Sequence, residues 1–131
     1  MRCRHRNGAL HVRVRREDHA LQRLGLRDED LLRCAGGFGP ATTCTWSLYF
    51  DGSDVGLGSA GRGGLSAASV SGNDLYLTTF GASPATGSSG RGNEVALCRD
   101  LRIGPATSCA SWSLFYVGLH GLDSIDALDL P

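Results

Sequence analysis

A repeated segment constrains this chain more than any other feature of its sequence. The stretch from Cys34 to Phe50 returns between Cys98 and Tyr116, with Cys, Gly-Pro-Ala-Thr, Cys and Trp-Ser-Leu in the same order. The offset grows from 64 residues at the first cysteine (98 against 34) to 66 at the tryptophan (112 against 46), as expected where turns accept single-residue insertions. Repeats of this kind are typical of proteins built from stacked or radially arranged units.

The second half of the repeat is less regular. Residues 65–70 align loosely with residues 125–130. Between these two stretches, alternating apolar, β-branched and aromatic residues predict four short strands separated by Gly, Ser, Asn and Pro turns. These strands are expected at about 65–70, 75–80, 94–98 and 111–117. Four antiparallel strands in roughly 65 residues match the size of a large β-propeller blade.

The predicted fold class is therefore all-β, with antiparallel four-stranded repeat units that are β-propeller-like blades, and a β-sandwich is the alternative. A propeller typically closes with four to eight blades. One full and two partial units therefore predict a fragment of a longer repeat protein, or several copies that self-associate through strand edges. The expected division is an Arg-rich, weakly structured arm (1–29), a partial unit (30–64), a full unit (65–117) and a second partial unit (118–131).

The charges are distributed unevenly along the chain. Thirteen arginines, with no lysine, balance thirteen acidic residues to a formal net charge of zero, which does not favour a nucleic-acid partner. Nine of the arginines lie within residues 1–33, but no interleaved aromatic residues accompany them to stack on bases. No stretch approaches the roughly 18 apolar residues of a membrane-spanning helix, and no apolar segment of a signal peptide follows the basic N-terminus.

The cysteines bracket the Gly-Pro loop of each copy, as Cys34 with Cys44 and Cys98 with Cys109, and leave Cys3 odd. If the flanking strands pair, each pair lies at the base of its loop, where a bridge is geometrically reachable. We predict disulfides Cys34–Cys44 and Cys98–Cys109, each stabilising by roughly 2–3 kcal/mol, and hence an oxidising compartment. Reduced structural thiols are the alternative. Zinc fits less well, because structural zinc ligands usually lie two to four residues apart.

Two features are candidates for ligand binding. Asp51-Gly52-Ser53-Asp54 places two carboxylates and a hydroxyl on one turn, a set that a calcium ion uses. The second copy does not repeat this set, and Asp-Gly-Ser is also ordinary turn chemistry, so we favour a bare turn over calcium. Trp46 and Trp112 at equivalent positions could stack on a sugar or a partner surface. Packing within or between units is the interpretation that we favour.

No constellation of residues predicts catalysis. The sequence has neither a Gly-x-Ser-x-Gly elbow nor a His-Glu-x-x-His motif. His120 is the only histidine of the repeat region, and the first copy has no counterpart to it. The glycines from Gly56 to Gly61 match a phosphate-binding pattern, but the residues after them do not predict the helix that this pattern requires.

The sequence Trp-Ser-Leu-Tyr-Phe-Asp-Gly-Ser-Asp-Val-Gly-Leu (46–57), together with Ser-Ile-Asp-Ala-Leu (124–128), resembles repeats of large secreted bacterial proteins of uncharacterised function. The resemblance covers roughly residues 30–131 and implies an exported, surface-type protein without a catalytic assignment. The second copy departs from it by losing Asp-Gly-Ser-Asp, and the first copy has Leu-Ser-Ala-Ala in place of Ile-Asp-Ala-Leu.

The predicted function is that of a non-enzymatic, secreted or cell-surface β-repeat module for protein or glycan interaction. Two alternatives remain open. One is a fragment of a propeller enzyme of hydrolase or lyase type, with its catalytic residues in other blades. The other is a calcium-stabilised adhesion module.

Overall fold

The structure is a computed structural model. It describes residues 4–6, 9–13, 25–37, 40–41, 43–58, 64–85, 92–118, 125, 127, 128 and 130, with the backbone alone for 4–6, 9–13, 37 and 44. Within these residues the fold is all-β, as predicted, with eight strands and one short 3-10 turn. The elements are β1 (Arg4–Arg6), β2 (Ala9–Arg13), β3 (Leu31–Gly37), β4 (Thr43–Phe50), η1 (Gly52–Val55), β5 (Leu65–Ser71), β6 (Asp74–Thr79), β7 (Glu94–Arg99) and β8 (Ser111–Val117).

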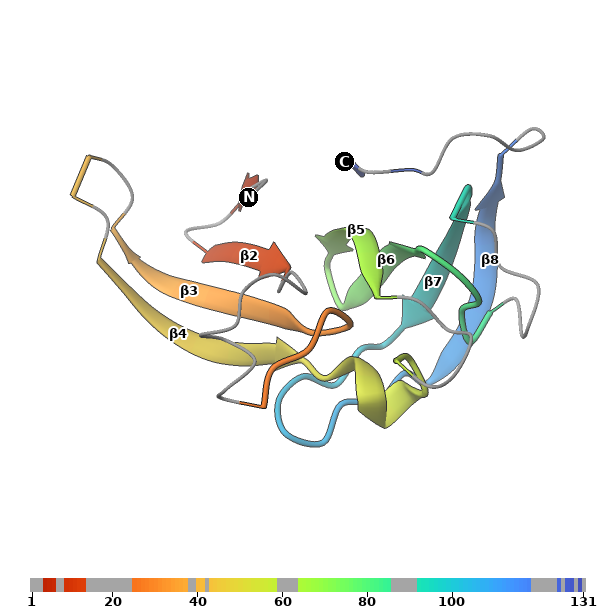
Figure 1. Cartoon of the computed structure of the whole chain (residues 1–131), viewed down its shortest axis with the longest axis horizontal. Helices are drawn as coiled ribbons and strands as arrows, with labels where there is room; N and C mark the ends of the chain where they lie inside the picture. Colours follow the sequence, from red (N-terminus) through yellow and green to blue (C-terminus); the bar gives the residue numbers. More distant parts are fainter. Residues whose placement is uncertain are drawn as a thin grey trace.

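The strands form two antiparallel sheets, in the orders β1-β2-β3-β4 and β5-β6-β7-β8 (Figure 1). We call them the first and the second sheet. Each strand pairs with its neighbour in sequence, so each sheet is a meander. The four strands predicted for residues 65–117 are all present. The turn between β5 and β6 contains Gly72 at φ +60°, a conformation that glycine adopts without strain.

The two copies of the repeat occupy equivalent places in the two sheets. In the first sheet Cys34 pairs with Trp46, and in the second Cys98 pairs with Trp112. The register shifts at the same point in both sheets. The shift lies between Leu31 and Leu32 in the first sheet and between Val95 and Ala96 in the second. Since register and irregularity are both repeated, the similarity of sequence is also a similarity of structure.

The N-terminal segment differs from the prediction. Residues 4–6 and 9–13, expected in a weakly structured arm, form β1 and β2 and complete the first sheet. Leu10 and Val12 pair with Cys34 and Leu32 of β3. Their alternation with polar residues has the period of a strand, and this local pattern outweighs the Arg-rich composition. The described residues therefore form two four-stranded sheets, whereas the prediction was one full and two partial units.

The C-terminal segment also differs from the prediction. A strand was expected at residues 125–130, but the described residues there (125, 127, 128 and 130) lie outside any strand. A strand requires a neighbour with which to form backbone hydrogen bonds. Among the described residues, Ile125 donates its amide to the Gly92 carbonyl at 2.9 Å, but no ladder of such bonds pairs this segment with a strand.

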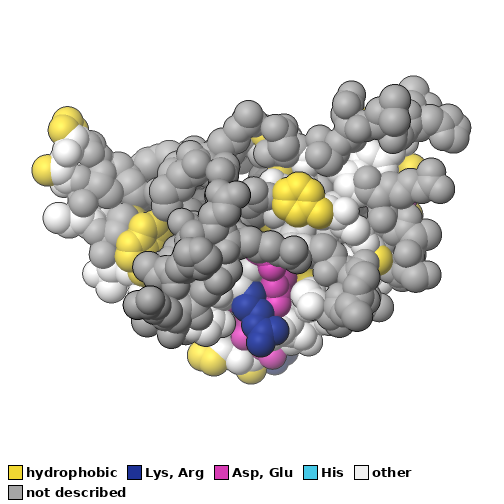
Figure 2. Space-filling view, in the orientation of Figure 1, with side chains coloured by type: hydrophobic (Ala, Val, Ile, Leu, Met, Phe, Trp, Pro, Cys, Tyr) yellow, Lys and Arg dark blue, Asp and Glu magenta, His cyan; other side chains and the backbone are white. Residues whose placement is uncertain are grey.

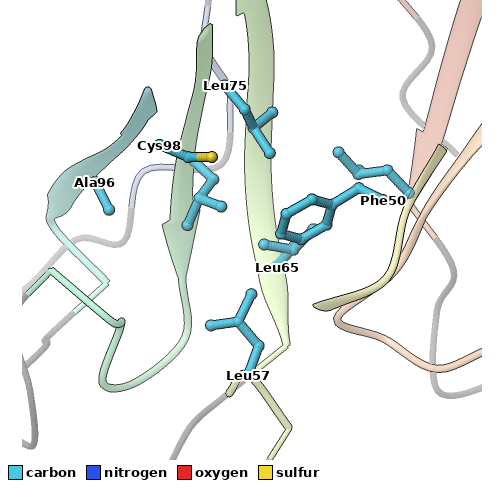
Figure 3. Packing of buried hydrophobic residues seen from close by; sticks show 8 residues of the cluster. Phe50, Leu57, Leu65, Leu75, Ala96 and Cys98 are labelled. Carbon is cyan, nitrogen blue, oxygen red and sulfur yellow. The ribbon is translucent and has the colours of Figure 1, made fainter. Parts of the chain in front are cut away.

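A single hydrophobic core joins the two sheets. The first sheet contributes Leu31 and Phe50, and the turn after η1 contributes Leu57. Figure 3 shows the Phe50 ring beside Leu65, at the boundary between the sheets. The residues from the second sheet are Leu65, Leu75, Leu77, Ala96 and Cys98. Because these side chains form one contiguous cluster, the sheets are packed against each other rather than tethered by a loop.

Candidate functional site: the polar junction between the sheets

Polar groups from four loops meet where the two sheets join. The loops are residues 25–30, the turn 51–58 that contains η1, Gly64, and the β7–β8 loop 100–110. Figure 1 places the first, second and fourth of these beneath and between the sheets. Figure 2 shows acidic and arginine side chains gathered at the same place, with hydrophobic side chains on either side. Because the buried side chains of Glu29, Asp30 and Thr107 meet here, this junction is the candidate functional site.

The Asp-Gly-Ser-Asp turn is shaped by its own first residue. Asp51 caps η1: its Oδ1 accepts hydrogen bonds from the Ser53 amide at 3.0 Å and from the Ser53 hydroxyl at 2.6 Å. The turn ends at Gly56 with φ +81°, which suits a glycine at the end of a helical turn. The carboxylate of Asp51 therefore has a structural task within the turn.

Thr107 fastens the second copy to this turn. Its backbone amide donates to Asp54 Oδ2 at 2.8 Å, and its hydroxyl accepts from the Asp51 amide at 2.9 Å. The same hydroxyl donates to the Gly104 carbonyl at 2.9 Å. The Gly-Pro-Ala-Thr turn of the second copy is thereby docked on the acidic turn that follows the first copy. Sequence reasoning missed this contact, which joins residues 53 positions apart.

Two buried carboxyls complete the junction. Asp30 accepts from the Arg27 amide at 2.8 Å and from the Gly52 amide at 3.1 Å. Burial raises the pKa of Asp30, and these two hydrogen bonds oppose the increase. Burial also raises the pKa of Glu29, whose Oε1 has no hydrogen-bond partner among the described residues. A Cβ at Gly52 would collide with the Glu29 carbonyl oxygen, so the close packing requires glycine there.

The predicted disulfide of the second copy is present. Cys98 and Cys109 are bonded, with their Cα atoms 5.3 Å apart, so the β7–β8 loop is closed at its base as expected from the repeat. Cys34 is also disulfide-bonded. The side chain of Cys44 and the whole of Cys3 lie outside the described residues, so the Cys34–Cys44 pairing stays a prediction.

The two tryptophans share a register position but are not brought together. Trp112 is half-buried and packs against the core that joins the sheets, whereas Trp46 is 46% exposed. Trp112 therefore has a packing role. Near it, Phe115 and Tyr116 of β8 are also exposed, and Phe115 meets Tyr76 edge-to-face with ring centroids 4.9 Å apart.

The described residues contain neither a cluster of metal-ligating side chains nor a membrane-spanning helix. No group of three or more His, Cys, Asp or Glu side chains that could hold a metal ion occurs in this part of the chain. The Asp51, Ser53 and Asp54 side chains form hydrogen bonds within the turn and with Thr107, and calcium there stays the untested alternative to a bare turn. His19 and His120 lie outside the described residues, as do residues 59–63 of the glycine-rich stretch. No helix of the described part is long and apolar enough to cross a membrane.

Comparison with known proteins found no matching family model, curated protein or solved structure. The resemblance to secreted bacterial repeats therefore stays a prediction that this chain's own residues must support.

Proposed function

We propose that the chain is part of a secreted or cell-surface β-propeller-like repeat protein that binds a partner, most simply another protein, and does not catalyse a reaction. One observation carries this proposal. The carboxylates and hydroxyl that could have formed a reactive site at the junction are engaged in hydrogen bonds that shape the turn after β4 and hold the β7–β8 loop against it. The side chains in question are Asp30, Asp51, Asp54 and Thr107.

The arrangement of the strands favours propeller-like blades over a sandwich. Each sheet takes four consecutive strands, and the chain passes from β4 through η1 into β5 of the next sheet. Sandwiches of the immunoglobulin type instead exchange strands between sheets through Greek-key connections. A meander followed by a short connection to the next meander is the order found in radially repeated sheets.

The disulfide-closed loop supplies a binding element. In the β7–β8 loop, Arg102, Pro105 and Ala106 are exposed, and Ile103 is 50% exposed. The bridge between Cys98 and Cys109 closes this loop, which lowers the entropy lost when it binds a partner. At the equivalent place the first copy carries Phe-Gly-Pro (38–40) where the second has Ile-Gly-Pro. An apolar residue before Gly-Pro in each loop suits contact with a protein better than with a glycan.

A selection experiment tests the proposal. The immobilised chain is panned against a phage-displayed library of random peptides, and enriched peptides are measured on Ile103→Asp and on the matched control Ser108→Ala. We expect at least tenfold weaker binding to Ile103→Asp, unchanged binding to the control, and weaker binding after reduction of the disulfide. Peptides that bind Ile103→Asp as tightly as the unchanged chain would overturn the proposal that the β7–β8 loop is the binding element. Turnover of chromogenic glycosidase, esterase or polysaccharide-lyase substrates by the purified chain would favour the enzyme alternative instead.

A further inference from the structure

The two sheets contact each other through unlike faces. The first sheet uses Leu31 and Phe50, whereas the second uses the face that carries Ala96 and Cys98. In the repeat, Leu31 corresponds to Val95 and not to Ala96. We call the face with Leu31 and Phe50 the forward face. Its equivalent in the second sheet carries Val95 and Tyr116. The opposite face is the back face, with Cys34 and Trp46 in the first sheet and Cys98 and Trp112 in the second.

An interface between a forward face and a back face is head-to-tail, so among the described residues it leaves one face of each kind without a neighbouring sheet. Equivalent positions differ in exposure accordingly. On the forward face, Phe50 is 0% exposed but Tyr116 is 52% exposed. On the back face, Trp112 packs against the core but Trp46 is 46% exposed. In these two aromatic pairs the residue is covered only where the other sheet lies on it, whereas Leu31 and Val95 are equally buried, at 3% exposed each.

The course of the chain after β8 points to the same surface. The Leu65 amide donates to the Asp28 carbonyl at 2.9 Å where the second sheet begins. The Ile125 amide donates to the Gly92 carbonyl at the same distance, and these two residues are the repeat counterparts of the first pair. Ser66 and Thr78 hold the Ile125 carbonyl at 2.9 and 3.0 Å. Ile125 therefore occupies the place at which a further sheet would begin.

We propose that the forward face of the second sheet binds the back face of the first sheet of a second copy of this chain. The inference rests on the repeat arrangement in the proposed function and deepens it by naming a partner. The interface within the chain is its template, because it joins the same two kinds of face. An exposed aromatic residue lies on each side, with Tyr116 on the forward face and Trp46 on the back face. Such residues dominate the cores of protein interfaces.

Two substitutions test the polarity of the interface. Trp46→Asp blocks the back face, and Tyr116→Asp blocks the forward face, each at a position that is about half exposed in the single chain. By sedimentation velocity we expect the unchanged chain to grow in mass with concentration, and each variant to remain a single chain at the highest concentration. An equimolar mixture of the two variants retains one intact forward face and one intact back face, so it should form a species of two chains and none larger.

The outcomes separate clearly. A single chain at every concentration for the unchanged protein overturns the proposal, as does a mixture of variants that stays monomeric. Continued association of either variant alone would show pairing of like faces, which also overturns it. Ile103→Asp should associate normally while losing the selected peptides. Failure of self-association is therefore distinguishable from failure of the proposed function.

A measurement on the unchanged chain guards against misfolded variants. If Trp46 becomes covered when copies associate, quenching of tryptophan fluorescence by acrylamide should fall at least twofold between dilute and concentrated samples. Trp112 is already half-buried, so it contributes little to the change. Quenching that does not depend on concentration contradicts burial of Trp46.

Discussion

The first and second sheets are built from the same repeat, yet equivalent residues have different surroundings. Phe50 of the first sheet is buried, and its counterpart Tyr116 is 52% exposed. Trp46 is 46% exposed, and its counterpart Trp112 packs against the core. The registers are the same in the two sheets, so the difference arises from the neighbour of each sheet and not from its internal structure.

The comparison teaches that the repeat encodes an interface as well as a sheet. Thr107 is needed not to form β7 and β8 but to dock their loop on the acidic turn of the first copy. Asp30 likewise supports the turn through the Gly52 amide. The role of a residue shared by repeated units is therefore missed when only one unit is considered, because some of its contacts are with the next unit.

The largest expected effect distinguishes the two equivalent aromatic positions. Phe50→Ala should lower the free energy of unfolding by about 3–5 kcal/mol, because it opens a cavity in the shared core. Tyr116→Ala should lower it by about 0.5 kcal/mol or less, as for an exposed position. Urea unfolding at a concentration where the chains are single measures both. Equal losses at the two positions would contradict the difference in burial between the sheets.

The disulfide of the second sheet gives the next effect in size. Replacing both Cys98 and Cys109 by alanine should cost about 2–3 kcal/mol, because the unfolded chain regains the freedom of the closed loop. The same double replacement at Cys34 and Cys44 should cost a similar amount if the predicted bridge closes the first loop. Intact mass without reductant provides the check, since each bridge removes about 2 Da. A Cys44 that reacts with iodoacetamide in the folded, unreduced chain would contradict the predicted pairing.

The sequence was informative where a pattern is local. The period of two and the cysteines around Gly-Pro predicted the strands of residues 65–117 and the Cys98–Cys109 bridge. The same alternation was present at Leu10 and Val12, but the arginines around them favoured an arm. The contact of Thr107 with Asp54 spans 53 residues. The acidic turn also occurs after only one of the copies, so comparing the copies does not reveal the contact.

A smaller effect is expected at the docked threonine. Thr107→Val keeps the shape of the side chain but leaves the partly buried Asp51 amide without its acceptor, which should cost about 1–3 kcal/mol. Thr42, its counterpart in the first copy, is the matched control. No Asp-Gly-Ser-Asp turn precedes Thr42 in the sequence, so Thr42→Val should cost about 0.5 kcal/mol or less. Thermal or urea unfolding of both variants measures the contrast, and equal costs would remove the docking role.

The smallest expected effect is a pH dependence confined to the junction after the first sheet. Burial raises the pKa of Glu29 above its usual 4.5 and that of Asp30 above its usual 3.8. The folded chain therefore holds these protons to higher pH than the unfolded chain does. Stability is then greatest below the unfolded-state values and falls as the pH rises from there through the raised values. The slope for each carboxyl is at most about 1.4 kcal/mol per pH unit.

Glu29→Gln tests this dependence because it removes one titrating group and keeps the size of the side chain. Urea unfolding between pH 3.5 and 7 should then show a flatter decline than in the unchanged chain. At the equivalent place the second sheet has Asn93, whose backbone carbonyl accepts from the Gly118 amide at 2.9 Å. This residue carries no charge, so Asn93→Gln should leave the slope unchanged. If the slope is the same with glutamine at position 29, the titrating group lies elsewhere. The places of Glu29 and Asn93 would then not differ in their effect on the pH dependence of stability.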